Sequence, residues 1–150
     1  MNELHMEVLR ATQESRMYAA IIAVAVCVIL LAAVWVTPSQ GGVGTHHQLG
    51  LPTCGWIVAA DIPCPTCGMT TSFAHAVRGH FLQSLFAQPM GLVLAIGTLL
   101  TGVIAIFTAV TGRSLALIWM PFCARKYIIL LGIFALLAWG FKILAYRGVF

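Results

Sequence analysis

Three long apolar segments constrain the fold of this chain more than any other feature of its sequence. They cover residues 18–36, 89–110 and 127–146, and the first two contain no charged residue. A helix needs roughly 20 apolar residues to cross the hydrocarbon layer of a membrane, at about 1.5 Å of rise per residue. Backbone groups inside that layer find partners only within a helix or a closed barrel. The sequence therefore predicts an all-α integral membrane protein with three transmembrane helices.

The composition agrees with this fold class and excludes several functions. Of the 150 residues, 61% are hydrophobic and only 8% are charged, whereas soluble domains carry about 25% charged residues. The net charge of +4 is small, and the basic residues are too scattered to indicate nucleic-acid binding. The sequence contains no phosphate-binding glycine loop, paired carboxylates or Gly-x-Ser-x-Gly motif. We expect a single membrane domain over residues 1–150, with the lipid bilayer as its partner and no nucleic acid.

The basic residues predict an orientation. Basic residues concentrate in the cytoplasmic loops of membrane proteins. Two segments are expected on that side: a short amphipathic segment, 1–17, and an inner loop, 111–126. Residues 115–124 of this loop are expected to form an inner-face or re-entrant turn. The two segments carry Arg10, Arg16, Arg113, Arg125 and Lys126, while Arg78 and Arg147 lie outside them. We predict a cytoplasmic N-terminus and an extracytoplasmic loop over residues 37–67. Lys142 lies near one end of the third span, where its ammonium group is expected to reach the lipid headgroups.

Residues 68–87 are predicted to form an amphipathic helix at the outer membrane surface. Apolar side chains recur there every four residues, with Gly79 as a position where the helix can kink; they are Met69, Phe73, Val77, Phe81 and Leu85. This spacing places them on one face of a helix, as in helices that lie in the membrane interface. His75 and Arg78 fall on another side, which we expect to face the headgroups.

The second span carries a seam of small residues: Gly91, Ala95, Thr98, Gly102 and Ala105. Small residues allow membrane helices to approach closely. The favoured interpretation is packing against another span of the same chain. The alternatives are a homo-oligomer, or docking into a larger membrane complex, through this face of the second span.

Three cysteines in the loop are the main candidates for a functional site. They are Cys54, Cys64 and Cys67, and the last two belong to a Cys64-Pro65-Thr66-Cys67 unit at the expected start of the interfacial helix. A helix N-terminus carries a partial positive charge, which stabilises a thiolate. Cys27, inside the first span, is interpreted as a small core residue, and Cys123 is expected on the opposite side of the membrane.

One hypothesis for these thiols is a metal site. The Cys-Pro-x-Cys-Gly pattern resembles one knuckle of rubredoxins and zinc ribbons. A structural zinc or iron ion held by Cys54, Cys64 and Cys67 needs a fourth ligand, and His47 is the best candidate. His75 is eight residues beyond Cys67 on a regular helix, or about 12 Å away. For His46 and His47 the simpler interpretation is ordinary loop polarity.

The other hypotheses are a structural disulfide and a thiol–disulfide oxidoreductase. In an oxidising compartment two of the thiols can form a disulfide that pins the helix, although one thiol is then left over. In the oxidoreductase hypothesis Cys64 and Cys67 of the CPTC motif are the catalytic pair and Cys54 is a resolving thiol. The thioredoxin-type βαβ pattern is absent from the sequence. The favoured hypothesis is a non-enzymatic structural or accessory protein with a metal or disulfide clasp; the oxidoreductase is the alternative.

Around these cysteines the sequence resembles a family of small bacterial membrane proteins of unknown function. The family pattern is a Cys, then a Cys-Pro-x-Cys-Gly-x-Thr unit, a Gly and an Asn-Pro that enters a membrane helix. The residues that match it are Cys54, Cys64, Pro65, Cys67, Gly68, Thr70, Gly79 and Pro89. Thr71 and Gln88 depart from the pattern, because the family often has Arg and Asn there. The resemblance implies a multi-pass protein of the bacterial plasma membrane, and it implies no known activity or cofactor.

Overall fold

The computed structural model describes residues 12–39, 41–113 and 125–148, and every regular element in these ranges is helical. The elements are α2 (Gln13–Trp35), η1 (Thr45–Leu49), α3 (Gly55–Ala60), α4 (Met69–Ala76), α5 (Phe81–Ala87), α6 (Pro89–Thr111) and α8 (Arg125–Tyr146). The predicted all-α fold class is confirmed.

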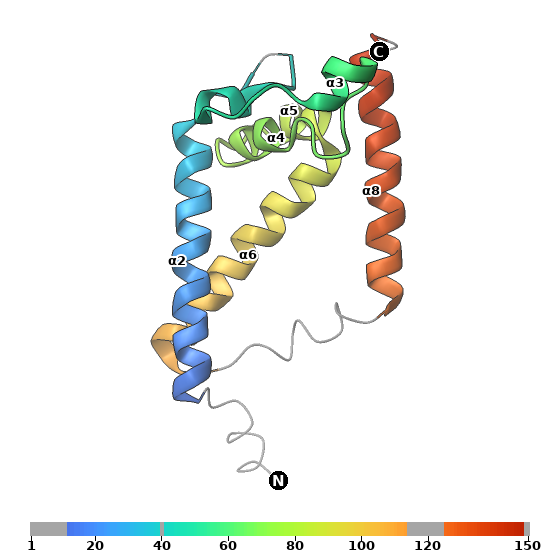
Figure 1. Ribbon diagram of the computed structural model, residues 1–150. Helices are drawn as coiled ribbons and strands as arrows, with labels where there is room; N and C mark the ends of the chain where they lie inside the picture. Colours follow the sequence, from blue (N-terminus) through green and yellow to red (C-terminus); the bar gives the residue numbers. More distant parts are fainter. Residues whose placement is uncertain (1–11, 40, 114–124, 149–150) are drawn as a thin grey trace.

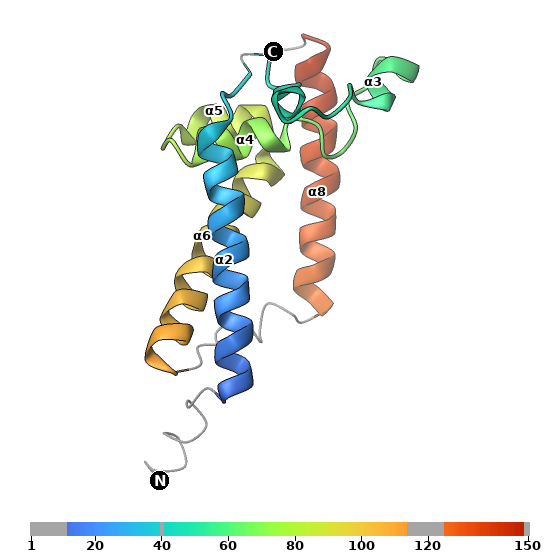
Figure 2. The ribbon, with the colours of Figure 1, turned by 60° about the vertical axis from the view of Figure 1, so that its left-hand side comes forward.

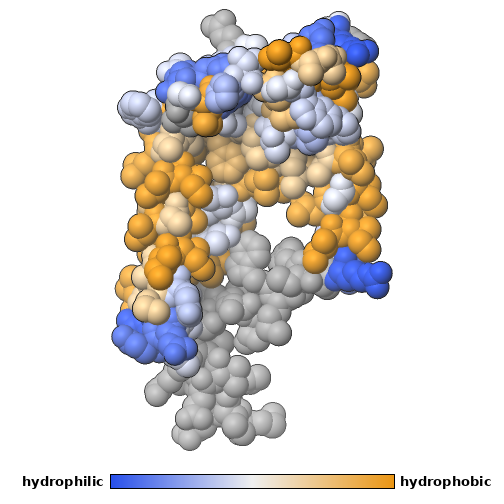
Figure 3. Space-filling model, viewed as in Figure 1, coloured by the Kyte–Doolittle hydropathy of each residue, from blue (hydrophilic) through white to orange (hydrophobic). Residues whose placement is uncertain are grey.

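Among the described residues, three helices are long and apolar enough to cross a membrane, namely α2, α6 and α8. The helix α6 slants from the lower part of α2 up to α4 and α5, which lie with α3 at one end of the molecule (Figures 1 and 2). The sides of the long helices form an apolar band between more polar ends (Figure 3). Large apolar side chains such as Leu31, 68% exposed, and Leu137, 67% exposed, stand on this band. Lipid chains are the environment that such a surface suits.

The small-residue seam of α6 packs within the chain, as the favoured interpretation has it. On α2 the buried residues Ala19, Val26 and Ala33 lie seven residues apart, on one face. A Cβ atom added to Gly102 of α6 would lie 2.7 Å from Cγ1 of Val26. Gly91, Ala95 and Ala105 are buried with Gly102, whereas Thr98 lines a cavity of about 870 Å³ between α2, α6 and α8. The two helices therefore pack through a glycine contact.

Two arginines cap the carbonyl ends of these helices. Arg16 at the start of α2 donates to the carbonyl oxygen of Ala109 in the last turn of α6, with its Nη2 at 3.0 Å. Arg78 reaches the other end of α2, where it donates to the carbonyl oxygens of Val34 at 2.7 Å and Val36 at 2.9 Å. Cations are favourable at this end of a helix because the last carbonyls have no partners within it. Arg78 remains exposed, so the expectation that it faces the lipid headgroups stays a prediction.

The predicted interfacial helix 68–87 is divided into two helices, α4 and α5. Gly79 has a φ of +77° between them, a left-handed conformation that glycine adopts readily and that ends a helix. The two pieces fold back on each other through Ser72 and Ser84, whose Oγ atoms are 2.8 Å apart. A Cβ atom on Gly91 would lie 2.7 Å from that of Ser72, so α4 also approaches α6 closely.

Two expectations for the inner side concern residues that are mostly outside the described ranges. Residues 1–11 of the expected amphipathic segment 1–17 are among these, while Gln13 to Met17 form the first turns of α2. The expected re-entrant turn at 115–124, with Cys123, also lies outside the described residues.

The glycine contact between α2 and α6 yields a test of the packing. We expect Gly102→Leu to lower the melting temperature of the detergent-solubilised protein, because a side chain at this position overlaps Val26. Overpacking of this kind typically costs about 1–3 kcal/mol. Gly97→Leu is the matched control on the same helix, since a Cβ atom there meets nothing within 4 Å. Equal melting temperatures for the two variants would contradict the described helix contact.

Candidate metal centre

Two features of the loop before α4, the short helix α3 and a tight turn, bring the three cysteines together. Cys54 is the residue that precedes the first turn of α3, and the chain leaves that helix through Asp61, whose φ is +51°. In the tight turn that follows, the amide of Cys67 donates to the carbonyl oxygen of Cys64 at 3.0 Å. Gly68 then enters α4 with a φ of +87°. This left-handed residue turns the chain immediately after the second thiol of the CPTC unit.

The three sulfur atoms of Cys54, Cys64 and Cys67 all lie within 4.8 Å of one another. The Sγ atoms of Cys64 and Cys67 are 3.3 Å apart. Cys67 is buried, at 5% exposure, while Cys54 and Cys64 are half-buried. Among the described residues this is the group of histidine, cysteine and acidic side chains whose atoms are close enough to share a metal ion.

Hydrogen bonds within the cluster separate the acidities of its thiols. Burial raises the pKa of Cys54, whereas hydrogen bonds from the Ile57 amide, the Cys67 thiol and the Trp56 amide lower it. The hydrogen bonds outweigh burial, and the pKa of Cys54 is about 6. For Cys67, burial and the hydrogen bonds to Cys64 and Cys54 raise the pKa to about 12. In the metal-free cluster at neutral pH, Cys54 is therefore a thiolate, stabilised by the amides of the first turn of α3, while Cys67 keeps its proton.

A close backbone approach lies directly beside the cluster at Gly68. A Cβ atom there would lie 2.6 Å from the carbonyl oxygen of Gly42 and 2.8 Å from that of Ala87. Glycine is the residue that fits, both for the space and for the positive φ. The same point receives Lys142 of α8, which donates to the Gly42 oxygen at 2.9 Å and to the Ala87 oxygen at 2.8 Å.

Lys142 therefore behaves differently from the sequence-based expectation. It is only 4% exposed, so its ammonium group is held by carbonyl oxygens inside the protein rather than by headgroups. The terminal carbonyls of α5 and of the loop favour a cation at this place. The expectation that Lys142 reaches the lipid headgroups is wrong.

One face of α8 holds the cysteine loop. Trp139, Lys142 and Tyr146 follow one another at spacings of three and four residues, so they share a face. Trp139 donates from Nε1 to the carbonyl oxygen of Pro63 at 2.9 Å, and the Tyr146 hydroxyl donates to Oδ1 of Asp61 at 3.2 Å. The ring of Trp139 also meets that of Trp56 edge-on, with centroids 5.9 Å apart. These contacts place α8 at the cysteine end of the molecule.

Polar side chains of α4 and of the residue before α6 form hydrogen bonds to the loop that precedes α4. Gln88 is fully buried and donates from Nε2 to the carbonyl oxygen of Pro65 at 3.0 Å. Thr71, also buried, shares a 2.7 Å hydrogen bond with Thr45 of η1. Both side chains therefore join the loop to the helices.

The histidines that the sequence offers as a fourth ligand lie outside the sulfur cluster. Nδ1 of His47 is 3.1 Å from the carbonyl oxygen of Leu51, and Nε2 of His46 is 3.2 Å from that of Pro52. His47 is therefore engaged with its own loop, and it is absent from the group of potential metal ligands. His75 lines a cavity of about 430 Å³ together with Lys142 and Tyr146. Burial, followed by the charges of His80 and Arg78, lowers the pKa of His75.

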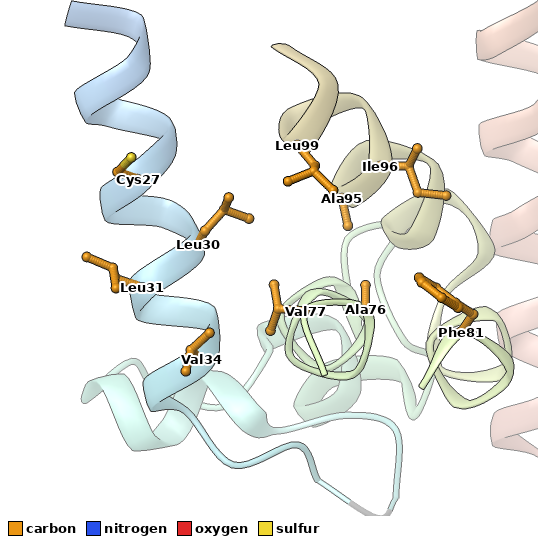
Figure 4. A pocket seen from close by; sticks show the side chains of 10 residues that line it. All are labelled: Cys27, Leu30, Leu31, Val34, Ala76, Val77, Phe81, Ala95, Ile96 and Leu99. Carbon is orange, nitrogen blue, oxygen red and sulfur yellow. The ribbon is translucent and has the colours of Figure 1, made fainter. Parts of the chain in front are cut away.

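Cys27 is remote from this centre. It lies on α2 and lines an apolar cavity of about 470 Å³, whose other walls come from α4, α5, α6 and the turn between α4 and α5 (Figure 4). Cys27 is exposed on the side of α2, which differs from the expected core position.

Comparisons with known proteins give one match. Residues 54–102 match the model of a family described as a protein of unknown function (DUF2752). The match begins at Cys54, includes Cys64 and Cys67, and ends at Gly102 in the contact with α2. No curated protein and no solved structure match the chain. The matched region is about a third of the chain, and it is similar to a family without an established function.

The different acidities of the thiols predict a pH-dependent reactivity in metal-free protein. The thiolate is the nucleophile in alkylation, so the alkylation rate of Cys54 should fall as the pH drops through about 6. Cys67 should stay slow up to about pH 9, because its pKa is raised to about 12. Mass spectrometry after iodoacetamide pulses at several pH values measures both rates. Equal rates for the two residues at pH 7 would contradict this description of the cluster.

Proposed function

We propose that this chain is a small structural or accessory protein of the bacterial plasma membrane, in which Cys54, Cys64 and Cys67 bind one metal ion, zinc or iron. The convergence of the three sulfur atoms within 4.8 Å is the observation that carries the proposal. The bound ion acts as a clasp that holds the cysteine loop against α4 and α8. The three long apolar helices support the membrane location.

The geometry favours a metal ion over a disulfide. Two sulfurs bound to one tetrahedral zinc at about 2.3 Å are about 3.8 Å apart, close to the separations in the cluster. A metal ion uses all three thiols, whereas a disulfide uses two and leaves one.

A structural role also fits better than thiol–disulfide exchange. An exchange centre must admit a partner protein to the attacked sulfur. Here Cys67 is buried and Cys64 is half-buried. The cluster is instead surrounded by contacts that join elements, from Trp139, Lys142 and Gln88. An ion at this place would stabilise the junction of the loop with α6 and α8.

The proposed function includes a fourth ligand for the ion and an orientation of the chain in the membrane. The fourth position on the ion is left for a water molecule or for His47, which reaches it only if the 3.1 Å contact with Leu51 is released. The cysteine loop is extracytoplasmic in the proposed orientation, with the N-terminus in the cytoplasm. Arg16 and Arg113 at the other end of α2 and α6 support this orientation by the positive-inside rule.

Metal content tests the proposal. We expect detergent-purified protein to contain about one zinc or iron ion per chain by elemental analysis, and Cys54→Ser, Cys64→Ser and Cys67→Ser each to lose most of it. Cys27→Ala is the matched control, because Cys27 lies on α2 away from the cluster, and it should keep the metal. Removing the ion with a chelator should lower the melting temperature of the wild type and leave that of Cys67→Ser unchanged.

The oxidoreductase alternative makes opposite predictions. In that case the purified protein contains no stoichiometric metal, Cys64 and Cys67 cycle between dithiol and disulfide, and Cys67→Ser accumulates a mixed disulfide with a partner protein. Those three results together would replace the metal clasp with a redox function.

A further inference from the structure

The buried ammonium group of Lys142 lacks a conventional counter-ion. It is 4% exposed, and its hydrogen-bond partners are two neutral carbonyl oxygens. Among the described residues no carboxylate pairs with it; Asp61 is exposed and accepts a hydrogen bond from Tyr146 instead. A buried charge is costly unless an opposite charge lies near it.

The turn that carries the CPTC unit packs directly against this ammonium group. The Nζ atom lies 3.1 Å from the Cβ position of Gly68, the residue next to Cys67. Lys142 and Cys67 interact electrostatically. The ammonium group therefore lies beside the glycine turn that directly follows the last thiol of the cluster.

We propose that Lys142 is the counter-ion of the metal-loaded cysteine cluster. This inference rests on the proposed metal site. Three thiolates and a divalent ion have a net charge of −1, which the ammonium group neutralises. Three thiolates and a monovalent ion have a net charge of −2, so the ammonium group stabilises that complex more strongly. A neutral fourth ligand, such as water or an imidazole, leaves these charges unchanged.

The counter-ion role explains why a lysine occurs at this depth in an apolar helix. A tether alone needs only a hydrogen-bond donor, as Trp139 provides for the carbonyl oxygen of Pro63. An ammonium group adds a fixed positive charge, which acts over several ångströms in a poorly screened environment. Lys142 is therefore a positioning and charge-setting residue that does not bind the ion itself.

The test compares the affinities of the full-length protein for Zn²⁺ and Cu⁺ in competition with chelators of known affinity. The ratio of the two affinities compares only the two loaded states, because the metal-free protein is common to both. Lys142→Gln keeps N–H donors for the carbonyl oxygens of Gly42 and Ala87 but removes the charge. Since the copper complex is the more negative one, we expect Lys142→Gln to lower the Cu⁺-to-Zn²⁺ affinity ratio by about tenfold or more.

Trp139→Phe is the matched control. It removes another hydrogen bond between α8 and the loop and leaves the charges unchanged, so its Cu⁺-to-Zn²⁺ ratio should equal that of the wild type. Lys142→Met is a second variant without charge, and it should shift the ratio in the same direction if Lys142→Gln folds poorly. A tether without an electrostatic role would lower both affinities together and leave the ratio unchanged.

The outcomes separate the inference from the proposed function. A ratio in Lys142→Gln within twofold of the wild type, or the same shift in Trp139→Phe, would overturn the counter-ion while the metal site stands. Failure of the wild type to bind either ion through its cysteines would overturn both.

Discussion

The close packing at Gly68 is the contact on which the cysteine end of the molecule depends. The carbonyl oxygens of Gly42 and Ala87 and the ammonium group of Lys142 meet where any larger residue would carry a Cβ atom. Through this point the loop, the end of α5 and the helix α8 are joined immediately beside Cys67. The thiols, the buried cation and the third span are therefore parts of one junction.

The three spans are held by two kinds of interaction, one between α2 and α6 and the other between α8 and the cysteine loop. The helices α2 and α6 pack through small side chains, with Gly102 against Val26, and arginines cap their carbonyl ends. The helix α8 is placed mainly by polar and aromatic contacts from Trp139, Lys142 and Tyr146 to the loop. A cavity of about 870 Å³ separates part of α8 from the other two spans. An ion that fixed the loop would therefore also fix α8.

Much of the fold follows from local features of the sequence. The spans are predictable because long uncharged runs have few alternatives in a membrane. The packing of Gly91 and Gly102 is predictable because small residues recur on one face of α6. The proximity of Cys64 to Cys67 follows from their spacing, whereas the approach of Cys54 depends on the path of α3 and on the turn at Asp61. That path is set by contacts with α8 that are distant in sequence.

The burial of Lys142 is a feature that the sequence does not reveal. A single basic residue near the end of a span usually reaches the headgroups, but Lys142 is buried and donates to carbonyl oxygens. Arg78 likewise donates to the last carbonyl oxygens of α2. Only the folded arrangement brings both basic groups near these carbonyls. The spacing of Trp139, Lys142 and Tyr146 along one face of α8 is a signal that the sequence does contain. The break at Gly79 divides a regular apolar pattern, because the glycine permits a left-handed turn that the pattern alone does not reveal.

In the proposed metal centre three sulfur atoms surround one metal ion at this junction. X-ray absorption spectroscopy at the metal edge of the purified protein counts the sulfur neighbours of the ion and measures their distance. We expect three sulfurs at about 2.3 Å for zinc and one lighter neighbour. An ion surrounded only by nitrogen and oxygen atoms, or by fewer than three sulfurs, would contradict it.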